Sequence, residues 1–286
     1  MSVFVYFLVI VSTVAQSAST KKFTRLGGNG TVFNVIKSAV AAVLLLVIAL
    51  AFGFDWHLPT VIYGAVFGLF LCVSMYCGYK ALALGPMSLT SMLVSFSVVL
   101  PLIYGVAFCD EPLNYLKYIA FMLIAVAILA ANADKIKKSD KKTENYALWI
   151  FFVAMTFLLN GFGSIVQKRH QILYPELYSR EFTFYAMLVC AIVYLALALL
   201  KAPLSEWRAV KGKRFGALAG AANGMASLFT VVLAGMENAS VLFPIVSVGT
   251  ILGSLLCGRF MFREKLKINH YVAFAAGAVA VLFLKL

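Results

Sequence analysis

The chain has 286 residues, of which 63% are hydrophobic and 12% are charged, and its mean hydropathy is +0.96. Soluble domains carry about 25% charged residues, so this composition excludes an ordinary soluble domain and indicates a protein that faces lipid. The formal net charge is +13, but the cationic residues stand between apolar runs, which is typical of membrane orientation signals and not of nucleic-acid binding.

Ten apolar segments are long enough, or nearly so, to cross a bilayer as helices, for which about 20 residues are needed. No basic residue precedes the first segment and no cleavage site follows it, so we interpret it as a transmembrane helix and not as a signal peptide. In chain order the predicted helices cover residues 3–20, 31–53, 59–84, 88–109, 115–132, 147–167, 181–200, 215–235, 240–261 and 270–284.

Two distant stretches of the chain have nearly the same pattern. "DEPLNYLKYIAFMLIAVAILA" begins at Asp110 and "REKLKINHYVAFAAGAVAVLFL" begins at Arg263; each has a Glu-x-Leu motif (Glu111, Glu264) followed by an apolar helix with matching Tyr, Ala and Phe residues. The match extends to the preceding helices. The further pairs are Gly64 and Gly216, Gly68 and Gly220, Ser88 and Ser240, Ser95 and Ser247, Thr13 and Asn160, Ser17 and Ser164, and Thr20 and Gln167.

These matches predict an internal duplication. Residues 1–133 form the first five-helix repeat, 134–146 a charged linker and 147–286 the second five-helix repeat. Because five crossings are an odd number, the second copy enters the membrane from the opposite side. The expected fold is therefore an all-α integral membrane protein with ten transmembrane helices as two inverted five-helix repeats, an architecture of many secondary transporters.

Polar residues recur at helical spacing within the apolar segments, in sets that match between the repeats. Polar side chains in a membrane span tend to face the interior of the bundle or a cavity. We expect these residues to line a polar cavity; the alternative is that they only support close helix contacts. The candidates are Thr13, Gln16 and Ser17, Ser95, Asn160 and Ser164, and Ser247 and Thr250.

Lys37 is the most specific single candidate, since it lies about six residues into the second predicted helix with Asn34 on the same face. A buried ammonium at this depth could bind a carboxylate or phosphate of a substrate. The alternative is that the side chain snorkels to the interface or pairs with backbone carbonyls. Further candidates for substrate contact are Tyr79, Tyr185 and Asn223, with interfacial or packing roles as alternatives for the two tyrosines.

No motif for a metal, a cofactor or catalysis is found. The five cysteines form no Cys-x-x-Cys or Cys/His cluster, and the three histidines form no HExxH motif. We therefore expect no catalytic residues, no metal, no cofactor and no enzymatic activity. No carboxylate is placed near the centre of a predicted helix, so the sequence gives no support for proton coupling.

Ten helices in two repeats, with Glu-x-Leu after the fourth and ninth, resemble the drug/metabolite transporter superfamily, and most closely its EamA-like family. In "NVIKSAVAAVLLL", Lys37 stands where the family usually has an arginine, and "YKALALGPMSLTSML" is similar to the family's turn into the fourth helix. The chain lacks the usual tryptophan of the first helix and the glutamate of the small multidrug resistance relatives. Ser97 replaces the usual proline of the fourth helix.

The resemblance implies a central cavity lined by helices one to four and six to nine, with the fifth and tenth peripheral. The expected function is alternating-access transport of a small polar metabolite, such as an amino acid or an amine, across the plasma (inner) membrane of a bacterium. Alternatives are a flippase for a lipid-linked sugar or other amphiphile, and a non-transporting receptor or scaffold. A homodimer through the fifth or tenth helix is a further expectation. The excess of cations in the odd-numbered connections places both termini outside, whereas the resemblance places them inside.

Overall fold

The computed structural model describes residues 2–26, 29–84, 94, 96–112, 114–136, 146–175, 177–201, 212–262 and 268–285. Within these residues the chain forms ten α-helices and a short 3₁₀ helix and has no strand, as expected from the sequence. The elements are α1 (Ser2–Arg25), α2 (Gly30–Ala51), α3 (Leu58–Leu84), η1 (Phe96–Val98), α5 (Val99–Phe108), α6 (Tyr115–Ile136), α7 (Tyr146–Leu173), α8 (Ser179–Lys201), α10 (Lys213–Met236), α11 (Ala239–Phe262) and α12 (Ile268–Lys285).

Seven of the helices in the described part of the chain are long and apolar enough to cross a membrane: α1, α2, α3, α7, α8, α10 and α11. The apolar stretches of the other three are shorter, at Phe96–Phe108, Tyr115–Ala130 and Ile268–Leu284. Helix lengths and composition are therefore those of a multi-pass integral membrane protein.

The chain divides into two compact units. Unit 1 consists of Met1–Cys72 and Val166–Met236, and unit 2 of Val73–Ile165 and Glu237–Leu286. Helices α3 and α7 each contribute to both units. Each unit thus combines segments that precede the predicted linker with segments that follow it.

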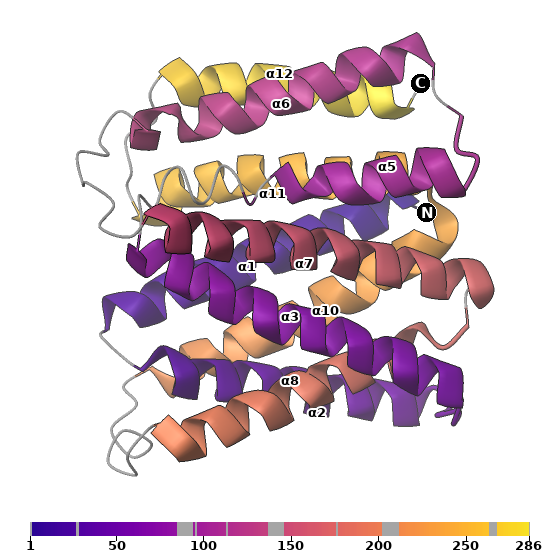
Figure 1. Ribbon diagram of the computed structural model, residues 1–286, viewed down its shortest axis with the longest axis vertical. Helices are drawn as coiled ribbons and strands as arrows, with labels where there is room; N and C mark the ends of the chain where they lie inside the picture. Colours follow the sequence, from indigo (N-terminus) through magenta and orange to yellow (C-terminus); the bar gives the residue numbers. More distant parts are fainter. Residues whose placement is uncertain are drawn as a thin grey trace. The chain divides into compact units, whose positions relative to one another are not determined.

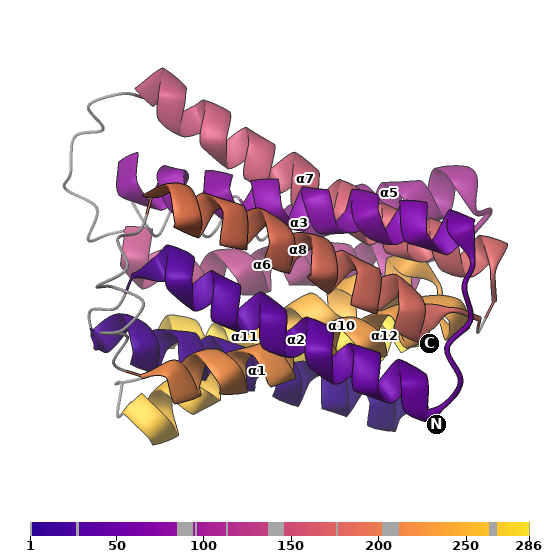
Figure 2. The ribbon, with the colours of Figure 1, turned by 90° about the horizontal axis from the view of Figure 1, so that it is seen from below.

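In unit 1, α2 and α8 lie side by side and run in opposite directions (Figures 1 and 2). Their pairing is fixed at one end by Arg180, at the start of α8, whose Nη1 donates to the carbonyl oxygen of Phe52 at 3.0 Å, just after α2. Helix α10 packs along both α1 and α2. Phe182, Leu45 and Leu233 are fully buried in this unit, which gives it an apolar core.

In unit 2, α6 packs against α12 and α5 against α11, both pairs antiparallel (Figure 1). Glu111, which follows α5, joins that second pair. Its two carboxylate oxygens accept from the backbone N–H groups of Ala239 and Ser240 at 2.6 and 2.8 Å. A carboxylate here satisfies two donors that a helix N-terminus leaves unpaired and complements the positive end of the helix dipole. Glu111 of the first Glu-x-Leu motif therefore caps the start of α11.

Candidate functional site

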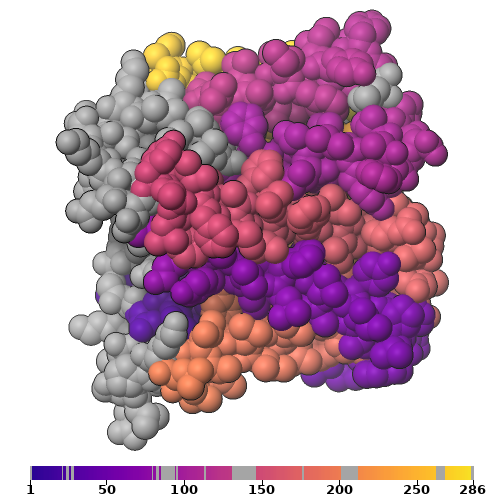
Figure 3. Space-filling view, viewed as in Figure 1, coloured from indigo at the N-terminus to yellow at the C-terminus, as the bar shows by residue number. Residues whose placement is uncertain are grey.

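The crossing of α3 and α8 in unit 1 depends on two glycines. A Cβ atom added to Gly64 would lie 2.8 Å from the carbonyl oxygen of Phe182, and one added to Gly68 would lie 2.6 Å from that of Ala186. Both distances are too short for a real side-chain carbon, so only glycine permits this backbone approach. On the face shown by the space-filling view, the atoms of α3 and α8 lie next to each other (Figure 3).

The crossing of α10 and α2 is built in the same way by Gly216 and Gly220. A Cβ on Gly216 would lie 3.0 Å from Cγ2 of Ile36, and one on Gly220 would collide with the carbonyl oxygen of Lys37. These glycines were matched in sequence to Gly64 and Gly68, and the helices that they face also correspond. The facing residues are Phe182, Tyr185, Ala186 and Val189 on α8, and, in the same order and spacing, Phe33, Ile36, Lys37 and Val40 on α2.

Lys37 and Ala186 therefore occupy matching positions. The backbone of each packs against a glycine of the crossing helix, although one side chain is a methyl group and the other a lysine. Lys37 is nevertheless 5% exposed, and its side chain lies inside unit 1 and not at the end of a helix. Burying an ammonium in a membrane segment is costly, and such groups usually serve a function. The backbone contact with the glycine does not itself require a lysine side chain.

Two thiols lie near the buried ammonium. Cys72 of α3 and Cys190 of α8 lie close enough to Lys37 to interact with it electrostatically. Both are buried, at 4% and 3% exposure. Cys190 also donates to the carbonyl oxygen of Gly68 at 3.4 Å, and the Tyr194 hydroxyl donates to that of Cys72 at 3.3 Å. Helices α2, α3 and α8 thus bring these groups together in a cluster that the sequence did not predict.

The other unit 1 candidates on α2, α8 and α10 lie on the helices of the two glycine crossings. Asn34 is half-buried one turn before Lys37. Asn223, on the same α10 face as Gly220, donates from Nδ2 to the sulfur of Met187 at 3.2 Å. Tyr185 is buried beside the rings of Phe54 and Trp56, and its hydroxyl has no hydrogen-bond partner among the described residues.

The polar stripe of α1 is only partly available to a ligand. Thr13 and Gln16 are half-buried and Ser17 is exposed. The Thr13 hydroxyl donates to the carbonyl oxygen of Val9 at 2.8 Å, so its proton is already used within its own helix. Such back-bonding satisfies a hydroxyl in an apolar setting without a cavity.

The unit 2 candidates have mixed surroundings. Asn160 accepts from the Ser74 hydroxyl through Oδ1 at 2.6 Å, which joins α7 to α3, and Ser164 donates to the Asn160 carbonyl oxygen at 3.2 Å. Ser247 is half-buried, and the Thr250 hydroxyl is buried without a hydrogen-bond partner among the described residues. Ser95 and the side chain of Tyr79 lie outside the described part of the chain.

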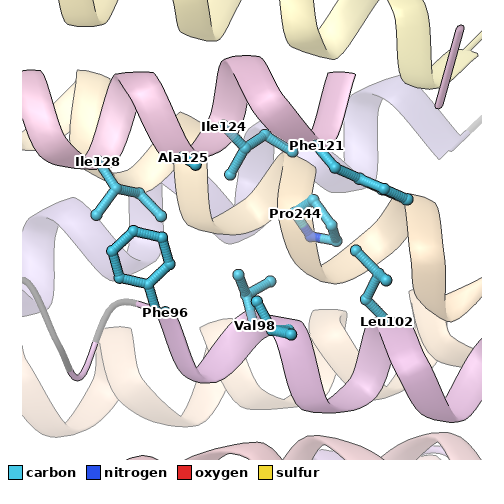
Figure 4. A pocket seen from close by; sticks show the side chains of 9 residues that line it. Phe96, Val98, Leu102, Phe121, Ile124, Ala125, Ile128 and Pro244 are labelled. Atoms are coloured by element: carbon cyan, nitrogen blue, oxygen red, sulfur yellow. The ribbon is translucent and has the colours of Figure 1, made fainter. Parts of the chain in front are cut away.

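Unit 2 also contains a cavity of about 50 Å³ between η1, α5, α6 and α11 (Figure 4). Its walls are apolar, so it offers no contacts for a polar substrate. Pro244 lies inside α11 at this wall, while Pro101 is in the first turn of α5, where proline is tolerated. The cavity is lined by Phe96, Val98, Val99, Leu102, Phe121, Ile124, Ala125, Ile128 and Pro244.

The sequence analysis missed the buried acid Glu181, which is 1% exposed in the first turn of α8. One of its oxygens, Oε2, has no hydrogen-bond partner in the described residues. An acid in a first turn is common because the helix dipole favours it there, so its position gives no hint of burial. His57 and His170, to which the sequence analysis gave no role, are joined through the Thr60 hydroxyl in unit 1.

Ala273 and Gly277 are small residues of α12 that could support a helix contact between two copies, but both are buried within unit 2, where a Cβ on Gly277 would lie 2.7 Å from Val248. They pack inside the chain and do not present a free dimer surface. A homodimer remains a prediction.

Comparison with known proteins supports the fold alone. No protein-family model matches the chain, and no curated protein matches its sequence. A solved structure described only as "Crystal structure of protein" superposes with a TM-score of 0.80 at 14% identity, covering 100% of this chain and 98% of that one. The helical arrangement therefore occurs in experimentally determined structures over the full length of the chain.

Proposed function

We propose that the protein is a secondary transporter that moves a small polar metabolite across a membrane by alternating access, and that Lys37 contacts an acidic group of the substrate. The protein would be built from ten spans in two inverted five-helix repeats, as in the drug/metabolite transporter superfamily. The site would include Lys37 with Asn34 and Asn223 nearby.

The antiparallel packing of matched helices supports the inverted repeat. Helices α2 and α8 are equivalent by their glycine crossings and run in opposite directions within unit 1. The matched pairs α5 with α11 and α6 with α12 are antiparallel within unit 2. Repeats related by an axis along the membrane normal would run parallel, whereas an axis in the membrane plane reverses them. Exchange of conformation between such halves is the physical basis of alternating access.

The observation that carries the substrate proposal is the difference between Lys37 and Ala186. Matching positions make the same backbone contacts, yet only one buries a cation, at 5% exposure. Burying a cation in a membrane segment is costly, and such groups usually serve a function, which suggests a ligand of opposite charge. A carboxylate or phosphate group would form charge-assisted hydrogen bonds with it.

Counterflow into proteoliposomes tests this proposal. The purified full-length protein is reconstituted with unlabelled amino acids, organic acids or sugar phosphates inside, and uptake of the labelled compound is measured. For a transported acid, Lys37→Met should reduce transport by about ten- to hundredfold, the value of one hydrogen bond to a charged group. Lys37→Arg should retain part of the activity.

The matched control is Lys80→Met, which removes the half-buried α3 lysine that lies over the ring of Tyr76 at 5.8 Å and should leave counterflow unchanged. Equal transport by the wild type and Lys37→Met would contradict the role of Lys37. Scrambling of labelled lipid without counterflow of any soluble compound would favour the flippase alternative.

A further inference from the structure

One corner of unit 1 contains a chain of hydrogen bonds through two histidines. Nδ1 of His57, just before α3, lies 2.9 Å from the Thr60 hydroxyl, which in turn lies 3.0 Å from Nε2 of His170 on α7. Nδ1 of His170 lies 3.0 Å from Nε2 of Gln171. Thr60 and His170 are both 0% exposed, and His57 is half-buried. A proton can therefore reach this chain of hydrogen bonds through His57.

The direction of these hydrogen bonds is fixed at Gln171. Its Nε2 group also donates to the carbonyl oxygen of Leu177 at 3.3 Å, so the amide nitrogen and not its oxygen must face that side. Gln171 then donates to Nδ1 of His170, which leaves the His170 proton on Nε2. That proton is donated to Thr60, and the Thr60 hydroxyl donates to Nδ1 of His57.

Both rings must be neutral in this arrangement. A protonated imidazole has two N–H donors, whereas His170 and His57 each accept one hydrogen bond within the chain. If His57 were protonated at Nδ1, both that N–H group and the Nε2–H group of His170 would point at the Thr60 oxygen. The buried hydroxyl proton of Thr60 would then lose its acceptor. His57 also precedes the first turn of α3, since its carbonyl accepts from Val61 N–H at 3.2 Å.

The same corner joins two interhelical connections by ring stacking. His57, in the α2–α3 connection, stacks on Tyr178 of the α7–α8 connection with ring centroids 4.5 Å apart and planes at 6°. The ring of Tyr174 makes a T-shaped contact with the ring of His57, with the two centroids 4.6 Å apart. Tyr178 has φ of 54°, a left-handed backbone that is unfavourable for a bulky residue and persists only when its surroundings hold it. Release of His57 would remove that restraint.

The matched corner at the other end of unit 1 has no histidine. Phe23 of α1 corresponds to His170 and stacks on Phe33 at 4.4 Å and 28°, while His170 packs on the matched Phe182 at 4.6 Å and 31°. Phe215, which corresponds to Tyr63, completes the apolar version. The fold therefore accepts phenylalanine at the His170 position, and the polar chain is an addition to it.

We propose that His57, Thr60 and His170 form a proton-operated latch, in which the neutral rings hold the α2–α3 connection against the α7–α8 connection and protonation releases them. The inference rests on the geometry of unit 1 and not on the transport proposal. The ligand of this site is the proton.

Other titratable groups on the surrounding elements require controls. His170 is faced by Tyr63 of α3, by Tyr174 after α7 and by the apolar ring of Phe182 on α8. Among the charged residues, Arg180 donates to Phe52 and Lys168 to the Ala234 carbonyl oxygen. Close to this corner, the other charged residues that the structure describes are exposed Asp55 and Arg169 and buried Glu181, while Lys80 and Lys201 stand near the far ends of α3 and α8. Glu181 is the one buried acid among them.

Hydrogen–deuterium exchange of the full-length protein in lipid nanodiscs, between pH 8 and 5.5, tests the latch. After correction for the intrinsic pH dependence, amides of the two connections should lose protection as the pH falls. If opening takes up one proton, the equilibrium constant for opening should rise about tenfold for each unit by which the pH falls below about 6.5, where free histidine titrates. His170→Phe and Thr60→Val should abolish this pH dependence.

Two variants act as controls. His270→Phe changes the remaining histidine, on α12, and Glu181→Gln removes the buried acid; both should keep the wild-type response. His170→Phe should remain folded because Phe23 fills the matched position. If that variant does not fold, Thr60→Val still tests the latch, because valine has nearly the same shape as threonine. A pH response that persists in both latch variants, that is lost in Glu181→Gln, or that is missing from the wild type would overturn the proposal.

Discussion

At the scale of single residues, side chains of the same chemical type have different roles that depend on what surrounds them. Glu111 and Glu181 are both buried, at 6% and 1% exposure. Glu111 has two backbone partners at the start of α11, whereas one oxygen of Glu181 has none in the described residues. The first acid therefore stabilises the fold, whereas the second is buried with one oxygen left without a partner among the described residues.

The capping role of Glu111 predicts a measurable loss of stability. Glu111→Gln removes the charge and one of the two acceptors from a buried helix N-terminus, which should cost about 1–3 kcal/mol and lower the thermal unfolding temperature in detergent. The control is Asp110→Asn, an exposed neighbour with φ of 50°, a backbone that asparagine tolerates. A Glu111→Gln variant as stable as Asp110→Asn would show that the cap is dispensable.

At the scale of helices, the two glycine crossings of unit 1 should be equally sensitive to added bulk. Gly68→Ala and Gly220→Ala each place a methyl group against a carbonyl oxygen of the facing helix, so each should destabilise the protein by about 1–3 kcal/mol. Gly30→Ala, where an added Cβ meets nothing within 4 Å, should be neutral or slightly stabilising. Thermal unfolding of the three variants checks this; a neutral result at only one crossing would contradict their equivalence.

The helices could be predicted because each needs an apolar run of about 20 residues, but the partners of their side chains could not. Thr13 has the spacing expected of a residue that lines a cavity, but its hydroxyl donates to the Val9 carbonyl oxygen four residues earlier. Both roles follow the same helical period, so the sequence cannot distinguish them. The Thr60–His170 contact joins residues 110 positions apart. It depends on which helices pack together. For the same reason the sequence could not decide whether Lys37 is buried, since a lysine that snorkels and one that is buried have the same sequence pattern.

At the scale of the whole molecule, the compact units cut across the predicted repeats. Unit 1 takes α1, α2 and part of α3 from the first repeat and part of α7, α8 and α10 from the second. Matched helices meet inside a unit, so a change of packing in one unit involves both repeats together. This arrangement is suited to exchanging two equivalent conformations, which the proposed transport requires.

The most direct test of the inverted duplication is the sidedness of matched positions. Leu26 after α1 and Leu173 at the end of α7 are equivalent in the predicted repeat, and their exposed fractions are 47% and 42%. Each is changed to cysteine in a background in which the half-exposed Cys109 and Cys257 are serine, and sealed proteoliposomes of known orientation are labelled with a membrane-impermeant maleimide. We expect the two cysteines to react from opposite sides of the membrane. Labelling of both from the same side would contradict the account.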